Sequence, residues 1–222
     1  MSSDWLRRRK KDQFHRLAKE KGYRSRASFK LLQVVERYKF IKRGDRVLDL
    51  GAAPGGWLQA VRQVVGESGY VLGVDKEPIV PLRYGNVNTI VLDIASMGAP
   101  NAIQTKSKME FDVVIADLSP NVSGVWELDH ARQIELARCA LRIARLLLKP
   151  SGNMLVKVFQ GSELKDFQID MKSSFRVLRV VKPPASRPES AELYFLGLGF
   201  VATPFSEGSQ SRRFGSSTQN VP

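Results

Sequence analysis

Five short, almost continuously apolar segments follow one another after residue 45, and polar or helical segments separate them. Short apolar runs bounded by polar loops are typical of strands that are covered on both faces of a parallel sheet. The clearest helix spans 130–149 and ends at Pro150-Ser151-Gly152, a helix-stop signal. This alternation predicts an α/β protein with right-handed crossovers. Its strands are predicted at residues 46–50, 70–75, 89–94, 111–117 and 153–159.

The last part of the pattern differs, because residues 174–183 and 192–202 are two β-rich runs with no helix between them. We expect these runs to form an antiparallel pair that closes the sheet. Seven strands, mostly parallel with an antiparallel closing strand and helices on both faces, make up the Rossmann-like class I S-adenosylmethionine methyltransferase fold. A standard dinucleotide dehydrogenase has a different sheet. Residues 203–222 are polar and rich in Ser and Gly, which predicts a disordered tail.

Positive charge is concentrated at the start of the chain. Residues 1–46 contain 16 Lys or Arg against five Asp or Glu, so this segment carries +11 of the formal net charge of +13. Such a concentration is typical of a protein that binds a polyanion. A basic arm that only aids solubility is the simpler alternative.

The composition excludes several kinds of protein. With 222 residues, 43% of them hydrophobic, the chain is long enough for one domain with a core. A single cysteine, Cys139, excludes an internal disulfide, and with two histidines it excludes the usual zinc spacings, so no metal is predicted. We expect Cys139 to be a small buried residue on a helix. Because no apolar run reaches roughly 18 residues, we predict a cytoplasmic, monomeric protein without a membrane span.

The loop after the first predicted strand is made of small residues, as in many nucleotide-binding folds. A dinucleotide site needs G-x-G-x-x-G, but the middle position here is Ala53, and Pro54 removes one N–H from the loop. No G-x-x-x-x-G-K-[ST] motif is present either. The loop therefore suits a ligand that approaches closely and lacks phosphates there, such as S-adenosylmethionine.

Two acidic residues support an adenosine-containing ligand. Asp75 ends the second predicted strand, where a carboxylate can accept hydrogen bonds from both ribose hydroxyls. Asp93 lies in the third predicted strand, where a carboxylate can meet the adenine amino group. Each residue alone is equally well explained as a turn or helix cap. With the glycine loop, they predict a cofactor site across three successive strands.

Five motifs make the sequence similar to a known family. In order and spacing they resemble the FtsJ/RrmJ family of RNA ribose 2′-O-methyltransferases, over roughly residues 20–200. The motifs are RSRASFKL (24–31), LDLGAAPGGW (48–57), DVVIADLSPNVSG (112–124), VKVFQG (156–161) and SAELY (190–194). The resemblance implies S-adenosylmethionine as cofactor and a catalytic tetrad at Lys30, Asp117, Lys157 and Glu192. It implies cofactor contacts at Gly55, Trp57, Asp75, Asp93 and Asp117.

The residue types of this tetrad fit the chemistry of methyl transfer to a hydroxyl. Transfer from a sulfonium is an in-line displacement, so alignment of oxygen, methyl and sulfur supplies much of the catalysis. Lys157 is the candidate base, a lysine in an apolar central strand that we expect at the exposed carboxyl edge of the sheet. It acts as a base only when neutral. Burial and Lys30 favour the neutral form, whereas Asp117 and Glu192 favour the charged form, which would orient the hydroxyl instead.

The resemblance also suggests a division of the chain. We predict a basic segment 1–46 with an RNA-facing helix packed on the catalytic domain, a methyltransferase domain 47–202 and the tail 203–222. The basic residues would bind RNA phosphates. Phe14, Tyr23 and Phe29 lie among them and are candidates for stacking on bases, although core packing is the better explanation of Phe29.

Our leading hypothesis is S-adenosylmethionine-dependent 2′-O-methylation of structured RNA, with a uridine of large-subunit ribosomal RNA as the target. The nearest alternative is the same reaction on the anticodon loop of a transfer RNA. An RNA-binding protein with a non-catalytic methyltransferase fold is a second class. An NAD-dependent oxidoreductase is a third, and the missing middle glycine disfavours it.

Overall fold

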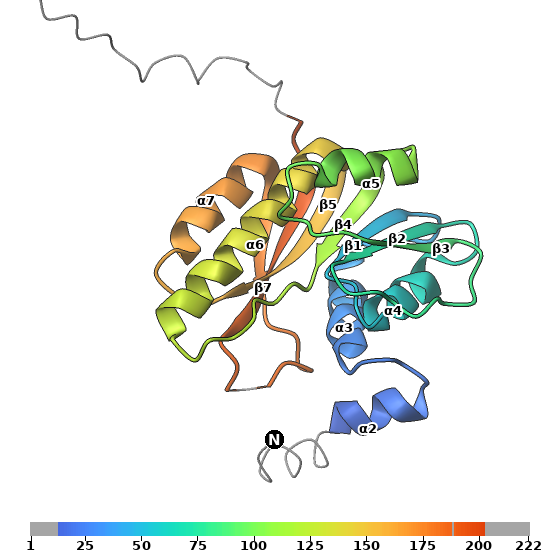
Figure 1. Ribbon diagram of the computed structural model, residues 1–222, viewed down its shortest axis with the longest axis horizontal. Helices are drawn as coiled ribbons and strands as arrows, with labels where there is room; N and C mark the ends of the chain where they lie inside the picture. Colours follow the sequence, from blue (N-terminus) through green and yellow to red (C-terminus); the bar gives the residue numbers. More distant parts are fainter. Residues whose placement is uncertain (1–12, 188, 203–222) are drawn as a thin grey trace, which may run out of the picture.

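A seven-stranded sheet forms the centre of the protein in a computed structural model that describes residues 13–187 and 189–202 (Figure 1). Its spatial order is β3-β2-β1-β4-β5-β7-β6. Strands β1 to β5 pair in parallel, and β7 runs antiparallel to both of its neighbours. The predicted, mostly parallel sheet with an antiparallel closing strand is confirmed. The strands are β1 (Arg46–Leu50), β2 (Tyr70–Asp75), β3 (Val87–Val91), β4 (Phe111–Ala116), β5 (Leu148–Phe159), β6 (Phe175–Val181) and β7 (Glu192–Phe200).

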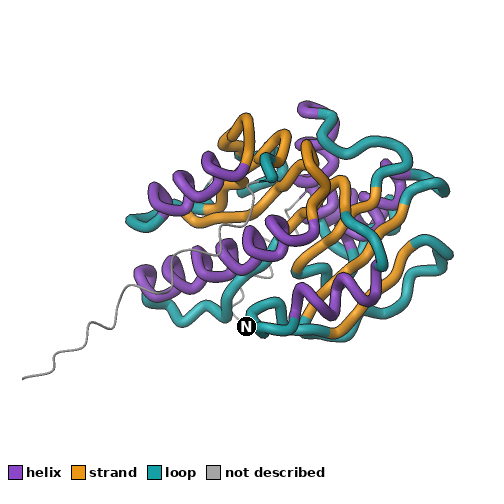
Figure 2. Tube along the Cα trace, turned by 90° about the horizontal axis from the view of Figure 1, so that it is seen from above, coloured by secondary structure: helices purple, strands orange, loops and turns teal. Residues whose placement is uncertain are grey.

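Helices cover both faces of the sheet, and a separate hydrophobic cluster fills the space on each side. Helices α3 and α4 pack on one face, whereas α5, α6 and α7 pack on the other (Figure 1). The longest helix, α6, runs beside the strands in Figure 2. The described helices are α2 (Gln13–Glu20), α3 (Ala27–Tyr38), α4 (Gly56–Val65), α5 (Ala99–Ser107), α6 (Trp126–Leu147) and α7 (Leu164–Ser174).

The segment before β1 packs on the rest of the protein. Leu31, Val34 and Val35 of α3 are buried in the same cluster as residues of α4 and the sheet. Phe29 is also buried, and its ring packs against those of Phe14 and Tyr23. Core packing therefore explains Phe29, as expected. The first 12 basic-segment residues and the predicted tail 203–222 lie outside the described residues.

Several predicted element boundaries were wrong, among them the starts of the third strand at Val87, of the long helix at Trp126 and of β5 at Leu148. Two of the ends have a local cause. The third strand ends at Val91 instead of residue 94, because the Asp93 carboxylate accepts a hydrogen bond from Ala95 N and forms a turn. The long helix ends at Leu147 instead of residue 149, since Pro150 disfavours helical geometry in the residue before it. Strand β5 consequently begins at Leu148, directly after α6.

Two kinds of feature are absent from the described part of the chain. None of its helices combines the length and apolarity that crossing a membrane requires. Within residues 13–187 and 189–202, no cluster of three or more His, Cys, Asp or Glu side chains is placed to hold a metal ion.

Candidate active site

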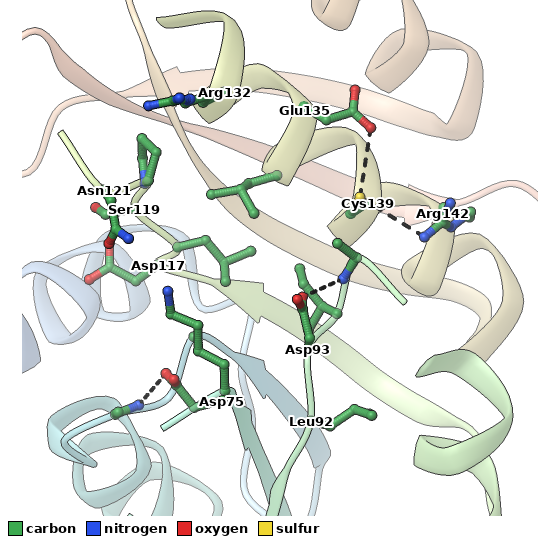
Figure 3. A pocket seen from close by; sticks show the side chains of 18 residues that line it. Asp75, Leu92, Asp93, Asp117, Ser119, Asn121, Arg132, Glu135, Cys139 and Arg142 are labelled. Atoms are coloured by element: carbon green, nitrogen blue, oxygen red, sulfur yellow. Dashed lines mark hydrogen bonds between the residues drawn. The ribbon is translucent and has the colours of Figure 1, made fainter. Parts of the chain in front are cut away.

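A cavity of about 720 Å³ opens beyond the carboxyl ends of β1, β2 and β4. Open α/β sheets bind ligands at this edge, where the strand order reverses. Asp75, Asp93 and Asp117 line the cavity from three neighbouring segments, after or at the end of β2, β3 and β4 (Figure 3). Residues of α6 form a further wall, and buried Cys139 lies on it between Glu135 and Arg142. The predicted helical position of Cys139 is confirmed.

The glycine loop forms the floor of this cavity. Gly51 has φ +81°, and a Cβ there would lie 2.9 Å from Cδ2 of Leu118, so only glycine fits without strain. Asp75 holds the loop, because its Oδ2 accepts a hydrogen bond from Ala53 N at 2.9 Å. Its Oδ1 accepts one from Glu77 N at 2.9 Å. The Asp75 carboxylate is therefore fixed at the edge of the cavity.

The start of α3 and the residues before it clamp the outer side of the glycine loop. Ser28 Oγ donates a hydrogen bond to Gly56 O at 2.8 Å, and a Cβ on Gly56 would lie only 2.2 Å from Ser25 Oγ. The Arg24 guanidinium donates to Pro54 O and Pro81 O, each at 3.1 Å. The helix that carries Lys30 is therefore held against the loop.

Two predicted cofactor contacts are not brought to the cavity wall. Gly55 adopts φ +103°, and a Cβ there would lie 2.9 Å from the Arg24 guanidinium. Trp57 is buried, and its indole N–H donates to Ala27 O at 2.8 Å. Neither residue lines the cavity. Trp57 instead ties the loop to Ala27 at the start of α3, and the lack of a side chain at Gly55 leaves room for the Arg24 guanidinium.

The four predicted catalytic residues assemble into two ion pairs beside the cavity. Lys30 Nζ lies 2.5 Å from Glu192 Oε1, and Lys157 Nζ lies 3.2 Å from Asp117 Oδ1. Asp117 also lines the cavity, so it connects the two parts of the site. The arrangement brings together residues from α3, β5, β7 and the loop after β4.

Tyr194 connects the two ion pairs, and the sequence analysis did not select it. Its hydroxyl lies 2.9 Å from Asp117 Oδ1 and 3.0 Å from Glu192 Oε1, so it can donate to either carboxylate. Burial and then the charges of Asp117 and Glu192 raise the pKa of Tyr194 well above its usual value, which keeps the hydroxyl protonated. Antiparallel register places Tyr194 opposite Lys157.

Lys157 is more enclosed than the sequence suggested. Its residue is 5% exposed, because β7 pairs along β5 and covers the end of the strand that we expected to be open. Lys157 Nζ donates to Asp117 O at 3.2 Å and to Ser119 Oγ, a second residue that the sequence analysis did not select. A buried lysine requires such partners.

Asp49 on β1 is the one described carboxylate that is fully buried without a hydrogen-bond partner for either oxygen. Burial, and then the negative charges of Asp117 and Asp75, raise its pKa well above the usual value. Burial therefore favours the neutral form of this side chain, which lies on β1 two residues before Gly51. Its position inside the LDLG motif was visible in the sequence, but its lack of a partner was not.

Comparisons with known proteins agree with this geometry. Residues 23–200, most of the chain, match the family described as FtsJ-like methyltransferase. The chain belongs to this family. It is therefore an S-adenosylmethionine-dependent methyltransferase, as the five sequence motifs predicted.

Relatives and solved structures are similar over most of their length. The chain is 47% identical to the ribosomal RNA large subunit methyltransferase E of Methanothrix thermoacetophila, covering 91% of this chain and 78% of the relative. It is 43% identical to the protein of that name from Methanocaldococcus jannaschii, covering 94% and 86%. Among solved structures, one described as a Plasmodium falciparum ribosomal RNA methyltransferase aligns with a TM-score of 0.70 at 25% identity, covering 80% of this chain and 98% of that one.

The cavity has the chemistry that S-adenosylmethionine needs. The cofactor carries positive charge on its sulfonium and ammonium groups, and Asp75, Asp93 and Asp117 line the cavity at the carboxyl edge of the sheet. The rest of the lining includes the acidic Glu135 and the basic Lys76, Arg132 and Arg142. The loop has Ala53 where a pyrophosphate site has its middle glycine, and the peptide bond between Ala53 and Pro54 is cis. Fibrillarin from Aeropyrum pernix, solved with S-adenosyl-L-methionine, shares the fold with a TM-score of 0.52 at 20% identity, covering 79% of this chain and 75% of that one.

Proposed function

We propose that this protein methylates the 2′-hydroxyl of a ribose in large-subunit ribosomal RNA, with uridine as the target nucleoside. The observation that carries the proposal is the position of Lys157, whose Nζ is paired with the cavity-lining Asp117. A methyl group held in the cavity and a hydroxyl placed at Lys157 would meet beside Asp117. The relatives named ribosomal RNA large subunit methyltransferase E support the choice of RNA.

In this proposal, Asp75, Asp93 and Asp117 bind the cofactor. Asp75 has lone pairs free for the ribose hydroxyls after its two backbone hydrogen bonds. Asp93 is held by Ala95 N in a turn that leaves its second oxygen for the adenine amino group. Asp117 attracts the positively charged methionine end. When bound, S-adenosylmethionine supplies the electrophilic methyl group. Gly55 and Trp57 support the loop indirectly.

Lys157 takes the proton of the 2′-hydroxyl in the proposed reaction. Asp117 Oδ1, Asp117 O and Ser119 Oγ match the three N–H donors of an ammonium. Lys157 can accept a proton only as the neutral amine, in which Nζ carries a lone pair. The 2′-hydroxyl would donate its O–H to the lone pair of the neutral amine and lose its proton to Lys157, as the O–C bond forms and the bond between the methyl carbon and the donor sulfur breaks.

The Lys30–Glu192 pair would hold the attacking ribose in line with the methyl group. Both side chains are nearly buried, at 14% and 13% exposure, so their 2.5 Å contact is weakly screened by solvent. Tyr194 transmits the position of Glu192 to Asp117 through its hydroxyl. We expect this chain of contacts to fix the acceptor geometry on which an in-line displacement depends.

Basic residues in and around α2 and α3 would contact RNA phosphates, so affinity should fall steeply with salt. Sedimentation of the purified protein would test the predicted monomeric state, and the cytoplasmic location also stays a prediction. The described part of the segment contains Arg16, Lys19, Lys21, Arg24 and Arg26.

Labelled cofactor distinguishes the leading target from its nearest alternative. The protein is incubated with labelled S-adenosylmethionine and either unmodified large ribosomal subunits or unmodified transfer RNA. We expect label in the ribosomal RNA. Label in transfer RNA alone would overturn that target and leave the reaction class intact.

A variant of Lys157 separates catalysis from RNA binding. Lys157→Ala should abolish methylation and leave RNA binding intact, because the change removes the proton acceptor and no phosphate contact. Equal turnover of this variant and the wild type would contradict the assigned role. Absence of transfer by the wild type to both RNAs would overturn large-subunit ribosomal RNA as the substrate.

A further inference from the structure

An exposed aromatic side chain lies beside the tetrad and has no part in the proposed chemistry. Trp126, the first residue of α6, is 47% exposed. Its ring stacks on Phe159 with centroids 6.0 Å apart and planes 19° apart. It also lies nearly parallel to His130, at 6.4 Å and 22°. Much of a large, flat apolar surface is therefore open to a ligand.

This aromatic pair adjoins the tetrad on β5 and β7. Phe159 is two residues beyond Lys157 and pairs with Glu192 in the antiparallel register. Side chains of opposed residues lie on the same face, with Cβ atoms about 4.5–5.5 Å apart. Ser119, which binds Lys157, begins the segment that leads to Trp126. The stacked rings of Trp126 and Phe159, called the platform below, therefore lie next to the tetrad residue Glu192.

The segment before Trp126 is held in place by a buried carboxylate. Asp129 accepts hydrogen bonds from Ser123 N at 2.7 Å, Ser123 Oγ at 2.8 Å and Gly124 N at 3.1 Å. The pKa of Asp129 is lowered, chiefly by the backbone hydrogen bond from Ser123, so this carboxylate stays charged at neutral pH. The indole is therefore presented by an ordered turn.

His130 supports the platform on the side of the protein interior. It is 2% exposed, and its Nε2 accepts a hydrogen bond from Glu163 N at 3.1 Å. A Cβ on Gly161 would lie 2.5 Å from the imidazole, so glycine is required there for the ring to fit. A platform held in this way loses little side-chain entropy when a ligand stacks on it.

We propose that Trp126, backed by Phe159, stacks on an unpaired nucleobase that neighbours the methylated ribose. The proposal rests on the proposed function, since it takes RNA as the substrate. Proteins read RNA sequence mainly at unpaired nucleotides, whose bases stack on aromatic side chains. Exposed Leu128 and Val125 lie nearby and would also suit a protein partner. The flat, stacked rings of Trp126 and Phe159 lie directly beside the tetrad, which favours a nucleobase over a protein partner as the ligand.

Kinetics with three variants test the platform. Trp126→Ala should raise KM for unmodified large-subunit ribosomal RNA about 10-fold, because one base stack is lost. Trp126→Phe keeps an aromatic face and should stay within about 2-fold of the wild type. Leu128→Ala, the matched control on the same patch, should change nothing. Calorimetry with S-adenosylhomocysteine should give equal affinities for all variants, which shows that each has folded.

Photocrosslinking gives a readout that does not depend on methyl transfer. Ribosomal RNA transcripts containing 5-iodouridine and 5-iodocytidine are irradiated with the protein, and crosslinked peptides are identified by mass spectrometry. We expect a crosslink at Trp126 that Leu128→Ala retains. No crosslink there, an unchanged KM in Trp126→Ala, or equal losses in Trp126→Phe and Trp126→Ala would overturn the platform. Failure of methyl transfer with an intact crosslink would refute the proposed function alone.

Discussion

The two sides of the active site balance their charges in different ways. On the side proposed to hold the ribose, called the acceptor side, the charged groups pair with one another. Two ion pairs, Lys30–Glu192 and Lys157–Asp117, are joined by the hydroxyl of Tyr194. On the cofactor side, Asp49 is buried without a partner, and the hydrogen bonds of Asp75 come from backbone N–H groups. The acceptor side is thus assembled by contacts between side chains of the protein, whereas Asp75 on the cofactor side keeps lone pairs free for a ligand after its two backbone hydrogen bonds.

The largest effect should come from breaking the acceptor side at its proton acceptor. Arginine retains charge and hydrogen bonds but stays protonated. Lys157→Arg should therefore lower kcat by about 10²- to 10⁴-fold, measured by methyl transfer at saturating RNA. Affinity for S-adenosylhomocysteine should not change. If Lys157→Arg retained most activity, the lysine would only orient the hydroxyl.

Removing negative charge from the cofactor side should weaken binding instead of turnover. We expect Asp75→Ala to raise the Kd of S-adenosylhomocysteine about 10- to 100-fold, since a hydrogen-bonded carboxylate is lost. The neighbouring Glu77→Ala is the control and should leave Kd within about 2-fold. Calorimetry measures both values. An unchanged Kd in Asp75→Ala would place the adenosine elsewhere.

Removing the connection between the two ion pairs should have a smaller effect. Tyr194→Phe should lower kcat about 10-fold, because the two carboxylates lose the hydroxyl that they share. Combined with Glu192→Gln, the loss should be less than the product of the single losses, since both changes act on one network. Fully independent losses would show that Tyr194 does not couple the pairs.

The smallest effect concerns stability and its dependence on pH. Burial raises the pKa of Asp49 in the folded state, so the folded protein binds this proton more tightly than the unfolded chain. Stability should therefore fall as pH rises above about 4, the unfolded value, towards the folded pKa. Asp49→Asn removes this loss. Urea unfolding at pH 4 and pH 7 should show a gain in the variant that is larger at pH 7.

The comparison also explains which features the sequence predicted. The parallel direction of the first five strands followed from continuous apolar runs, which are typical of a sheet covered on both faces. The order of the strands in the sheet comes from the structure. The boundaries after Val91 and Leu147 were missed, since a side-chain turn at Asp93 and a proline override the apolar pattern there.

Site residues could be predicted from the sequence where the proposed chemistry requires a charged side chain. They were harder to predict where the role of a residue depends on its contacts in the folded protein. The four charged tetrad residues were selected through their motifs, and the structure brings them together as two ion pairs, while their catalytic role stays a prediction. Tyr194 was missed, although it ends the SAELY motif, because its role depends on the register with Lys157. The hydrogen bond from the Trp57 indole N–H to Ala27 O could not be predicted from the motif, and a cofactor contact at Trp57 stays a prediction. Only tertiary contacts distinguish these cases.

The position of the transferred methyl group tests the central proposal most directly. Unmodified large-subunit ribosomal RNA is treated with the protein and labelled S-adenosylmethionine, digested, and analysed for nucleosides by mass spectrometry. We predict label in 2′-O-methyluridine, within a linkage that resists alkaline cleavage because its 2′-oxygen is blocked. Label on a base instead of a ribose would contradict the proposal that Lys157 meets a 2′-hydroxyl.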